Sequence, residues 1–159
     1  MKKLFLLLLL LVLPLPSAIT GTYIFYQQAS LTSSAQKVTI QQVSSGTRDI
    51  HFDSVSMWCS EDATFTLSKA GTAATTTAGT IVKINTPNPA STVTAYTSSN
   101  VGSETTLNAY AFKKDSSPLV IDLKSMVIPR NSGTTGNLTL GTNSITATCR
   151  ISFLWDEEL

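Results

Sequence analysis

The segment RDIHFDSVSMWC, residues 48–59, holds the side chains of this chain that most resemble catalytic machinery. Asp49, His51 and Asp53 alternate, so in a strand they would project from one face, as a general base between orienting carboxylates would. A catalytic triad also requires a nucleophile within hydrogen-bond reach of the histidine. The sequence has many serines but no GxSxG elbow that would single one out. We therefore predict no catalytic residues and a protein that is not an enzyme.

The sequence gives equally little support to a metal site and to nucleic-acid binding. One histidine and two widely separated cysteines form no recognised ligand spacing, so we expect neither a metal nor another cofactor. The chain has 11 basic and 10 acidic residues and a formal net charge of +1. Because no basic field is available to attract phosphates, we expect no nucleic-acid partner.

The alternation of residue types in the same segment indicates which of its side chains are buried in a strand. Cys59 and the apolar residues two and four positions before it predict one buried face of the strand. With uninterrupted alternation, His51 and both aspartates would be buried on that face without partners, which is unfavourable. A β-bulge near Asp53 and Ser54 would turn Phe52 inward instead. We therefore predict that His51 and the acids lie on a solvated strand face.

Trp58 is the residue of this segment with the best prospect of a binding role. It lies on the face opposite Cys59, among serines. An aromatic plane surrounded by hydroxyls can stack on a sugar ring or anchor a protein interface, whereas a tryptophan covered by a loop would do neither. Trp58, Tyr96 and Tyr110 are the candidate ligand or interface residues.

The two cysteines are both predicted to point inward, because Cys149 lies on the apolar face of the alternating segment 144–155. A disulfide between Cys59 and Cys149 requires Cα atoms about 5.5 Å apart, which suits neighbouring strands but not sheets about 10 Å apart. A disulfide and a pair of buried free thiols both remain open. A secretory leader favours the bond.

The composition of the whole chain and the spacing of its turn-forming segments are typical of an all-β protein. Only 13% of the residues are charged, and threonine, which favours strands, is abundant. Short apolar or alternating runs recur between turn-forming segments, at residues 37–43, 49–59, 63–68, 80–85, 92–97, 106–112, 118–123, 137–140 and 144–155. We predict a two-sheet antiparallel β-sandwich of eight or nine strands, with a jelly roll favoured over an immunoglobulin-like topology.

The N-terminus predicts the compartment. Residues 1–18, MKKLFLLLLLLVLPLPSA, have the basic start, apolar run and small-residue end of a signal peptide, and residues 4–26 are the alternative as a membrane anchor. Residues 19–36 are expected to be the leader remainder and a polar linker, and residues 37–159 the β-sandwich domain. The protein is then secreted or extracytoplasmic, at a cell surface or in a virion, and meets a membrane only through a retained N-terminal segment.

Three stretches, TAGTIVKIN, TAYTSSNVGSET and NLTLGTNSITATCRISFLWDEE, resemble small jelly-roll-like β-sandwich proteins of bacteriophage and prophage type. Those proteins end in a segment of the form T-x-S-I-T-x-x-x-x-I-x-F-x-W-x-E, and the resemblance spans residues 37–158. It implies a place in a virion and assigns no functional residue.

These observations together predict a non-enzymatic extracytoplasmic β-sandwich module with a structural or attachment role, as a virion, fibre or cell-surface component. Its low charge and many threonines suit packing between like subunits, so we expect self-association as a homo-oligomer or adhesion to a surface glycan or protein. The alternative is a secreted carbohydrate-binding module that uses Trp58, Tyr96 or Tyr110.

Overall fold

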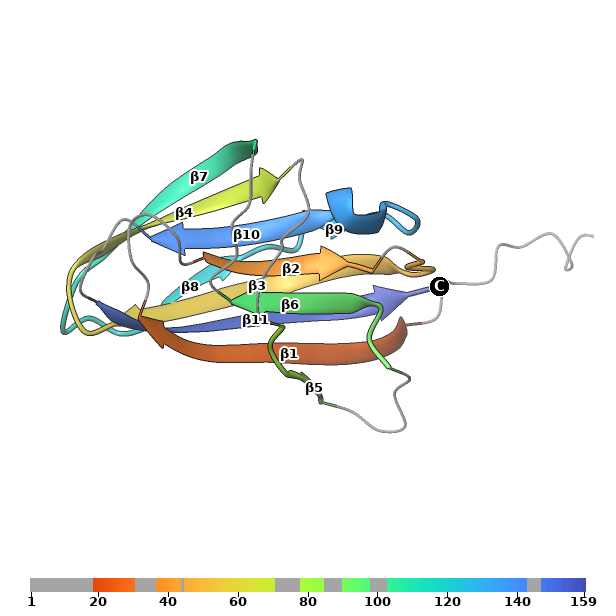
Figure 1. The fold of residues 1–159 in the computed structure, drawn as a ribbon. Coiled ribbons are helices and arrows are strands. Elements are labelled where there is room, and N and C mark those ends of the chain that lie inside the picture. The colour runs from red at the N-terminus through yellow and green to blue at the C-terminus, as the bar shows by residue number, and fades with distance from the viewer. Residues whose placement is uncertain are drawn as a thin grey trace, which may run out of the picture.

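The fold consists of two antiparallel sheets packed face to face (Figure 1). A computed structural model describes residues 19–30, 37–43, 45–70, 78–84, 90–97, 103–142 and 147–159. These residues form eleven strands and one short 3-10 helix, η1 (Gly133–Thr135). The prediction of an all-β two-sheet sandwich is confirmed.

The strands divide between the sheets as follows. Sheet A has the order β5 (Ile81–Lys83), β1 (Ile19–Ser30), β11 (Thr148–Glu158), β3 (Asp49–Cys59), β8 (Leu119–Asp122), with β9 (Val127–Ile128) also paired to β3. Sheet B has the order β6 (Val93–Thr97), β2 (Lys37–Gln42), β10 (Asn137–Thr142), β4 (Ala63–Ala70), β7 (Glu104–Phe112).

Eight of these strands have the connectivity of a jelly roll. Without β5, β6 and β9, sheet A contains the first, eighth, third and sixth strands along the chain, and sheet B contains the second, seventh, fourth and fifth. This is the arrangement of a jelly roll, so the favoured topology is confirmed. β5 and β6 extend the edges next to β1 and β2. The nine predicted strands are all present, and β1 and β9 bring the total in the described residues to eleven.

The core lies between the sheets and follows the predicted alternation of β11, which occupies the centre of sheet A between β1 and β3. Cys149, Ile151, Phe153 and Trp155 are all buried, while the residues between them face outward. Ile145, which the alternation of the segment 144–155 assigns to the same face as Cys149, lies outside the described residues.

The bulge predicted in β3 is present. Ser54 and Phe52 pair with consecutive residues of β11, so Asp53 is the extra residue. Phe52 is consequently buried, whereas Asp49 and His51 face outward and are partly exposed. The solvated placement of the histidine and the acids is confirmed.

Cys59 and Cys149 form a disulfide. They are direct partners in the register of β3 and β11, with Cα atoms 4.1 Å apart, and both are fully buried. Of the two alternatives left open by the sequence, the cross-linked one is therefore present, and it joins neighbouring strands of one sheet.

The N-terminal boundary of the domain differs from the prediction. Residues 19–30, expected to be leader remainder and linker, form β1, which pairs with β11 over its length. Tyr23 and Phe25 are fully buried in the core, so residues 19–26 are part of the domain and not the end of a membrane anchor at 4–26. The strand escaped prediction because its apolar residues follow directly on those of the leader.

The remaining N-terminal predictions are untested by the fold. Residues 1–18, the predicted signal peptide, and residues 31–36 of the predicted linker lie outside the described residues. Within the part of the chain that the structure describes, no helix is long and apolar enough to span a membrane.

Candidate functional site

The three aromatic candidates do not form one site. Trp58 lies on the outer face of sheet A, because its neighbour Cys59 points into the core. Tyr96 lies on the outer face of sheet B, in the edge strand β6. Tyr110 pairs with Phe65 and packs partly buried against the core. Of the three, Trp58 lines a groove on the surface, together with Tyr26 and Arg150.

Trp58 lines a groove of about 410 Å³ on the outer face of sheet A. The register places Tyr26, Ser152 and Ser56 in one row across β1, β11 and β3, and places Arg150 beside Trp58 in the next row. Two small serines thus lie between larger groups, which creates the depression. Because β1 and β3 flank β11 at strand spacings of about 4.8 Å, Tyr26 and Trp58 stand on strands about 10 Å apart.

Arg150 changes what Trp58 can do. The guanidinium carbon of Arg150 lies over the indole, 5.7 Å from the ring centre, at a distance typical of a cation–π contact. One face of the indole is therefore in contact with Arg150, and a binding role of Trp58 stays a prediction. The exposed aromatic ring of the groove is Tyr26, which is 53% exposed.

Sequence reasoning missed Tyr26 and did not assign a role to Arg150. Tyr26 belonged to the segment interpreted as leader, so no binding role was considered for it. Alternation in the segment 144–155 puts Arg150 on the face opposite Cys149, but it does not reveal which residue stands beside Arg150 on the next strand. The cross-strand register supplies that information.

Beyond the groove, the outer face of sheet A carries several exposed apolar residues beside the polar and charged residues at the other end of β3 and β11. Val82, Ile24 and Leu154 form a cross-strand row on β5, β1 and β11. Val82 is 53% exposed, and Val120 on β8 is 64% exposed. A sandwich normally turns polar side chains outward on the sheet face that is not packed, so the exposed apolar residues Val82 and Val120 are departures from this pattern.

The histidine segment is engaged in surface ion pairs. His51 Nε2 lies 3.5 Å from a carboxylate oxygen of Glu158, and its side chain is 38% exposed. Asp49 accepts hydrogen bonds from the Arg130 guanidinium, at 2.8 Å, and from the Arg130 backbone N–H, and these bonds lower the pKa of Asp49. The described residues contain no group of three or more His, Cys, Asp or Glu that could hold a metal ion.

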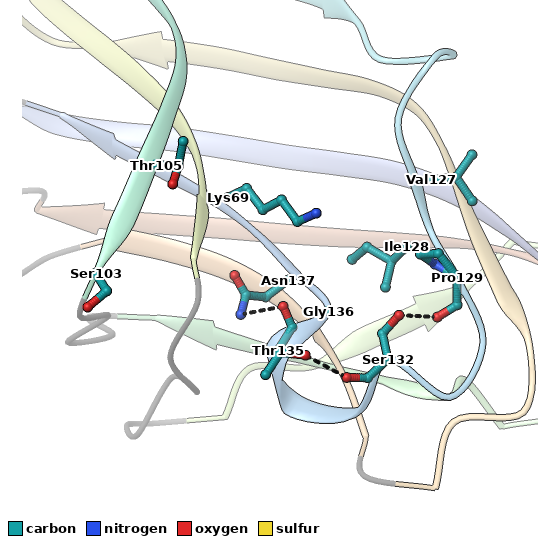
Figure 2. A pocket seen from close by; sticks show the side chains of 10 residues that line it. All are labelled: Lys69, Ser103, Thr105, Val127, Ile128, Pro129, Ser132, Thr135, Gly136 and Asn137. Atoms are coloured by element: carbon teal, nitrogen blue, oxygen red, sulfur yellow. Dashed lines mark hydrogen bonds between the residues drawn. The ribbon is translucent and has the colours of Figure 1, made fainter.

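A second hollow lies between the β4–β7 end of sheet B and the segment that links β9 to η1. It has a volume of about 520 Å³ and adjoins a smaller hollow of about 280 Å³ that shares Lys69 and Val127. Figure 2 shows the Lys69 side chain extending between Thr105 on one wall and Ile128 on the other. Its other lining residues are Ser103, Val127, Pro129, Ser132, Thr135, Gly136 and Asn137.

The wall formed by η1 is internally hydrogen-bonded. The hydroxyl of Ser132 donates to the carbonyl of Pro129, and the hydroxyl of Thr135 donates to the carbonyl of Ser132 at 2.8 Å (Figure 2). These polar groups are satisfied without a ligand. The hollow is therefore the space that opens where β7 separates from sheet A, and it carries no cluster of groups poised for chemistry.

Among the strands that the structure describes, β7 is the longest of those with a neighbour on one side only. Among the described residues it pairs only with β4, and Thr105 to Ala109 are five consecutive exposed residues, so both of its faces are open there. Residues 105–112 contain no charge. Leu107 is 43% exposed. The backbone N–H of Ala109 donates to the Asn108 side chain at 2.8 Å. An edge strand with one neighbour can pair with a further strand along its other side.

One buried charged group belongs to the framework and not to a site. Glu157 is fully buried and accepts hydrogen bonds from Arg48, at 3.1 Å, from the backbone N–H and hydroxyl of Thr92, both at 2.9 Å, and from the hydroxyl of Ser91. Both carboxylate oxygens are thus occupied. The cluster holds the residues that precede β6 in sheet B against β11 in sheet A.

No protein-family model and no curated protein sequence matches this chain. Its function is therefore inferred from two surfaces: the groove on the outer face of sheet A and the open edge of β7.

Proposed function

We propose that the protein is a non-enzymatic structural module that acts outside the cytoplasm and assembles with further copies of itself through β7. The observation that carries this proposal is the open β7 edge, nine residues long and uncharged from Thr105 to Phe112. Figure 1 shows β7 at the margin of sheet B, away from the strands of sheet A.

A long, uncharged strand edge of this kind is expected to pair with another strand. Exposed strand edges template pairing with other chains, and sandwich proteins usually block them with charged residues, proline, bulges or very short strands. The edge strands of sheet A are very short, since β5 has three residues and β8 has four. β7 has neither a charge nor a proline within residues 105–112. Its bulge, opposite Leu67 and Ser68, distorts pairing only at that point.

A second copy of the chain fits this edge. In an antiparallel pair of β7 strands, the start of one strand meets the end of the other. The start carries Glu104, paired with Lys37 at 2.6 Å, and the end is followed by Lys113, paired with Asp62 at 2.8 Å. Both charges are already paired within their own chain, so the ends of such a pair oppose no unpaired like charges, and an isologous dimer with a continuous ten-stranded sheet results.

Two further features support an extracytoplasmic place for this assembly. The disulfide between Cys59 and Cys149 suits an oxidising compartment. β1 begins at Ile19, directly after the predicted leader of residues 1–18, so removal of the leader would leave every described strand intact. The resemblance to jelly-roll-like phage proteins supports a virion or fibre as the structure in which the module serves.

The test is a pair of lysines on the β7 edge. We expect the wild-type protein to be a dimer by size-exclusion chromatography with light scattering. Leu107→Lys with Ala109→Lys should convert it to a monomer with an unchanged circular dichroism spectrum, because charges on both faces of an edge strand oppose pairing. Val82→Lys with Ile84→Lys, on the exposed edge of sheet A, adds the same charge and should leave the dimer intact.

Two results would contradict the proposal. The first is a wild-type protein that remains monomeric at every accessible concentration. The second is a dimer that dissociates with the Val82 and Ile84 variant and persists with the β7 variant, which would place the interface on sheet A.

The second candidate function is binding of a surface carbohydrate, and one observation favours it. Tyr26, Ser152, Ser56 and Arg150 present a ring, hydroxyls and a charge along one shallow groove. Such a module would attach the assembly to its target.

A further inference from the structure

We propose that the hollow between the β4–β7 end of sheet B and the β9–η1 segment binds a fatty acid, with its carboxylate on Lys69 and its hydrocarbon chain between the two sheets. The site consists of the larger hollow of about 520 Å³ and the adjoining smaller hollow of about 280 Å³. This ligand goes beyond the proposed structural role, and its binding rests neither on assembly through β7 nor on the groove of sheet A.

Lys69 lies on the inner side of sheet B although it is charged. Along β4, Phe65 and Leu67 are buried against the core, and Lys69 is the next residue with the same orientation in the strand. Lys69 lines both hollows together with Ile128 from the opposite sheet. In Figure 2 its side chain extends from β4 toward Ile128. A cation therefore stands where the inward-facing row of this strand reaches the end of the core.

Lys69 has no anionic partner in the part of the chain that the structure describes. Four other lysines each form an ion pair with a carboxylate, namely Lys37, Lys113, Lys114 and Lys124. Among the described residues that line the two hollows, Lys69 alone is charged. A ligand with one negative group is therefore complementary to this site.

The smaller hollow provides the apolar part of the site. Its lining includes apolar residues of both sheets and of the segment between β8 and β9, namely Phe52, Leu107, Met126, Ile128 and Leu138. Phe52 and Leu138 are buried core residues, whereas Leu107 is 43% exposed. The hollow thus continues the hydrophobic core outward, and a hydrocarbon chain placed in it would remove apolar surface from water.

The two hollows together select a long-chain carboxylate. A small anion would contact Lys69 but leave the apolar lining uncovered, and a neutral lipid would gain nothing from the ammonium group. At about 280 Å³, the smaller hollow is at the lower end of the range of about 300–1,000 Å³ typical of ligand sites, so it suits one chain and not two. Because Lys69 is exposed, its ion pair with the carboxylate is expected to contribute modestly to affinity.

The experiment separates the contribution of the head group from that of the chain. The purified protein is titrated calorimetrically at neutral pH with decanoate, with decanol and with acetate, all below the concentration at which decanoate forms micelles. We expect decanoate to bind and acetate to give no measurable binding. The ratio of the decanoate affinity to the decanol affinity then measures how much the site favours the negative charge.

Variants of Lys69 test the head-group contact. This ratio should fall about fivefold in Lys69→Gln and further in Lys69→Glu, because only the charged ligand uses the ammonium group. Lys69→Arg keeps the positive charge and should keep most of the ratio. Lys114→Gln, at an exposed lysine that lines neither hollow, is the matched control and should keep the wild-type ratio.

A variant in the smaller hollow tests where the chain lies. Met126→Trp adds bulk to the lining and should weaken decanoate and decanol alike, by about tenfold, as expected when the space for a chain is partly filled. The melting temperature of each variant shows that it is folded. If Met126→Trp does not fold, the ratios of the Lys69 variants decide alone.

The proposal is overturned if decanoate does not bind, if acetate binds as tightly as decanoate, or if Lys69→Gln keeps the wild-type ratio. A folded Met126→Trp variant that binds both long-chain ligands as wild type does would also overturn it. Light scattering should give Lys69→Gln the oligomeric state of wild type, so a failure of fatty-acid binding is distinguishable from a failure of assembly.

Discussion

The disulfide between Cys59 and Cys149 should carry a large part of the stability of this fold. The two residues are separated by 90 positions, so the bond closes a long loop in the unfolded chain. In the chain-entropy model, a loop of about 90 residues lowers the free energy of folding by about 4.6 kcal/mol. That is a large fraction of the 5–15 kcal/mol that folded proteins typically have.

The expected change in melting temperature follows from the size of the domain. At about 2.1 cal/mol/K per residue over the roughly 110 residues that the structure describes, the entropy of unfolding is about 0.23 kcal/mol/K. A loss of about 4.6 kcal/mol therefore corresponds to a decrease of about 20 °C.

Reduced wild-type protein is the cleanest perturbation, because both sulfurs remain and only the bond is lost. The protein is reduced in denaturant, refolded with reductant present, and compared with oxidised protein by thermal circular dichroism. The Cys59→Ala and Cys149→Ala double variant serves as a second measurement and should melt at or below the reduced protein, since it also removes buried sulfur atoms.

Two outcomes would refute this reasoning. One is a decrease of only a few degrees on reduction. The other is labelling of two thiols in the unreduced, unfolded protein, which would show that the bond is absent.

Two other predictions concern buried groups. Glu157→Ala should destabilise the protein by about 3–5 kcal/mol in urea denaturation, because Arg48 would lose its buried partner, and a change below 1 kcal/mol would show that the cluster is dispensable. Burial, followed by the negative charge of Glu157, raises the pKa of Tyr23 above its ordinary value of 10.0. The folded state therefore holds this proton more tightly, so the stability it contributes is complete below pH 10.0 and is lost as pH rises through the higher pKa of the folded state. Tyrosinate absorbance should show one tyrosine that ionises only as the protein unfolds, and complete titration of a folded protein would contradict this placement.

Alternation along single strands was enough to predict most of the framework. The alternation of apolar and polar residues in β11 identified its buried face. In β3, uninterrupted alternation would bury both Cys59 and His51, and the cost of burying His51 identified the bulge at Asp53. Both inferences needed only the physical cost of burying unpaired polar groups. The same alternation gave the inward direction of both cysteines, although not their adjacency, which depends on strand order.

The candidate site was less predictable because it depends on register between strands that are distant in sequence. Trp58, Tyr96 and Tyr110 were grouped by residue type, but they lie on three different surfaces. Tyr26 and Arg150 come from opposite ends of the chain and meet near Trp58 only when β1, β11 and β3 are side by side. β1 was hidden by the apolar leader that precedes it, and β9, with two residues, is too short to show a period.

The position of β11 has a consequence for when the protein can fold. β11 follows every other strand along the chain, yet it forms the centre of sheet A, where Ile19 pairs with Glu158. Until the ribosome has made these last residues, β1 and β3 have no strand between them, and Cys59 has no partner. The order of synthesis therefore makes the centre of sheet A, and with it the cross-link between Cys59 and Cys149, the last part of the described fold to form.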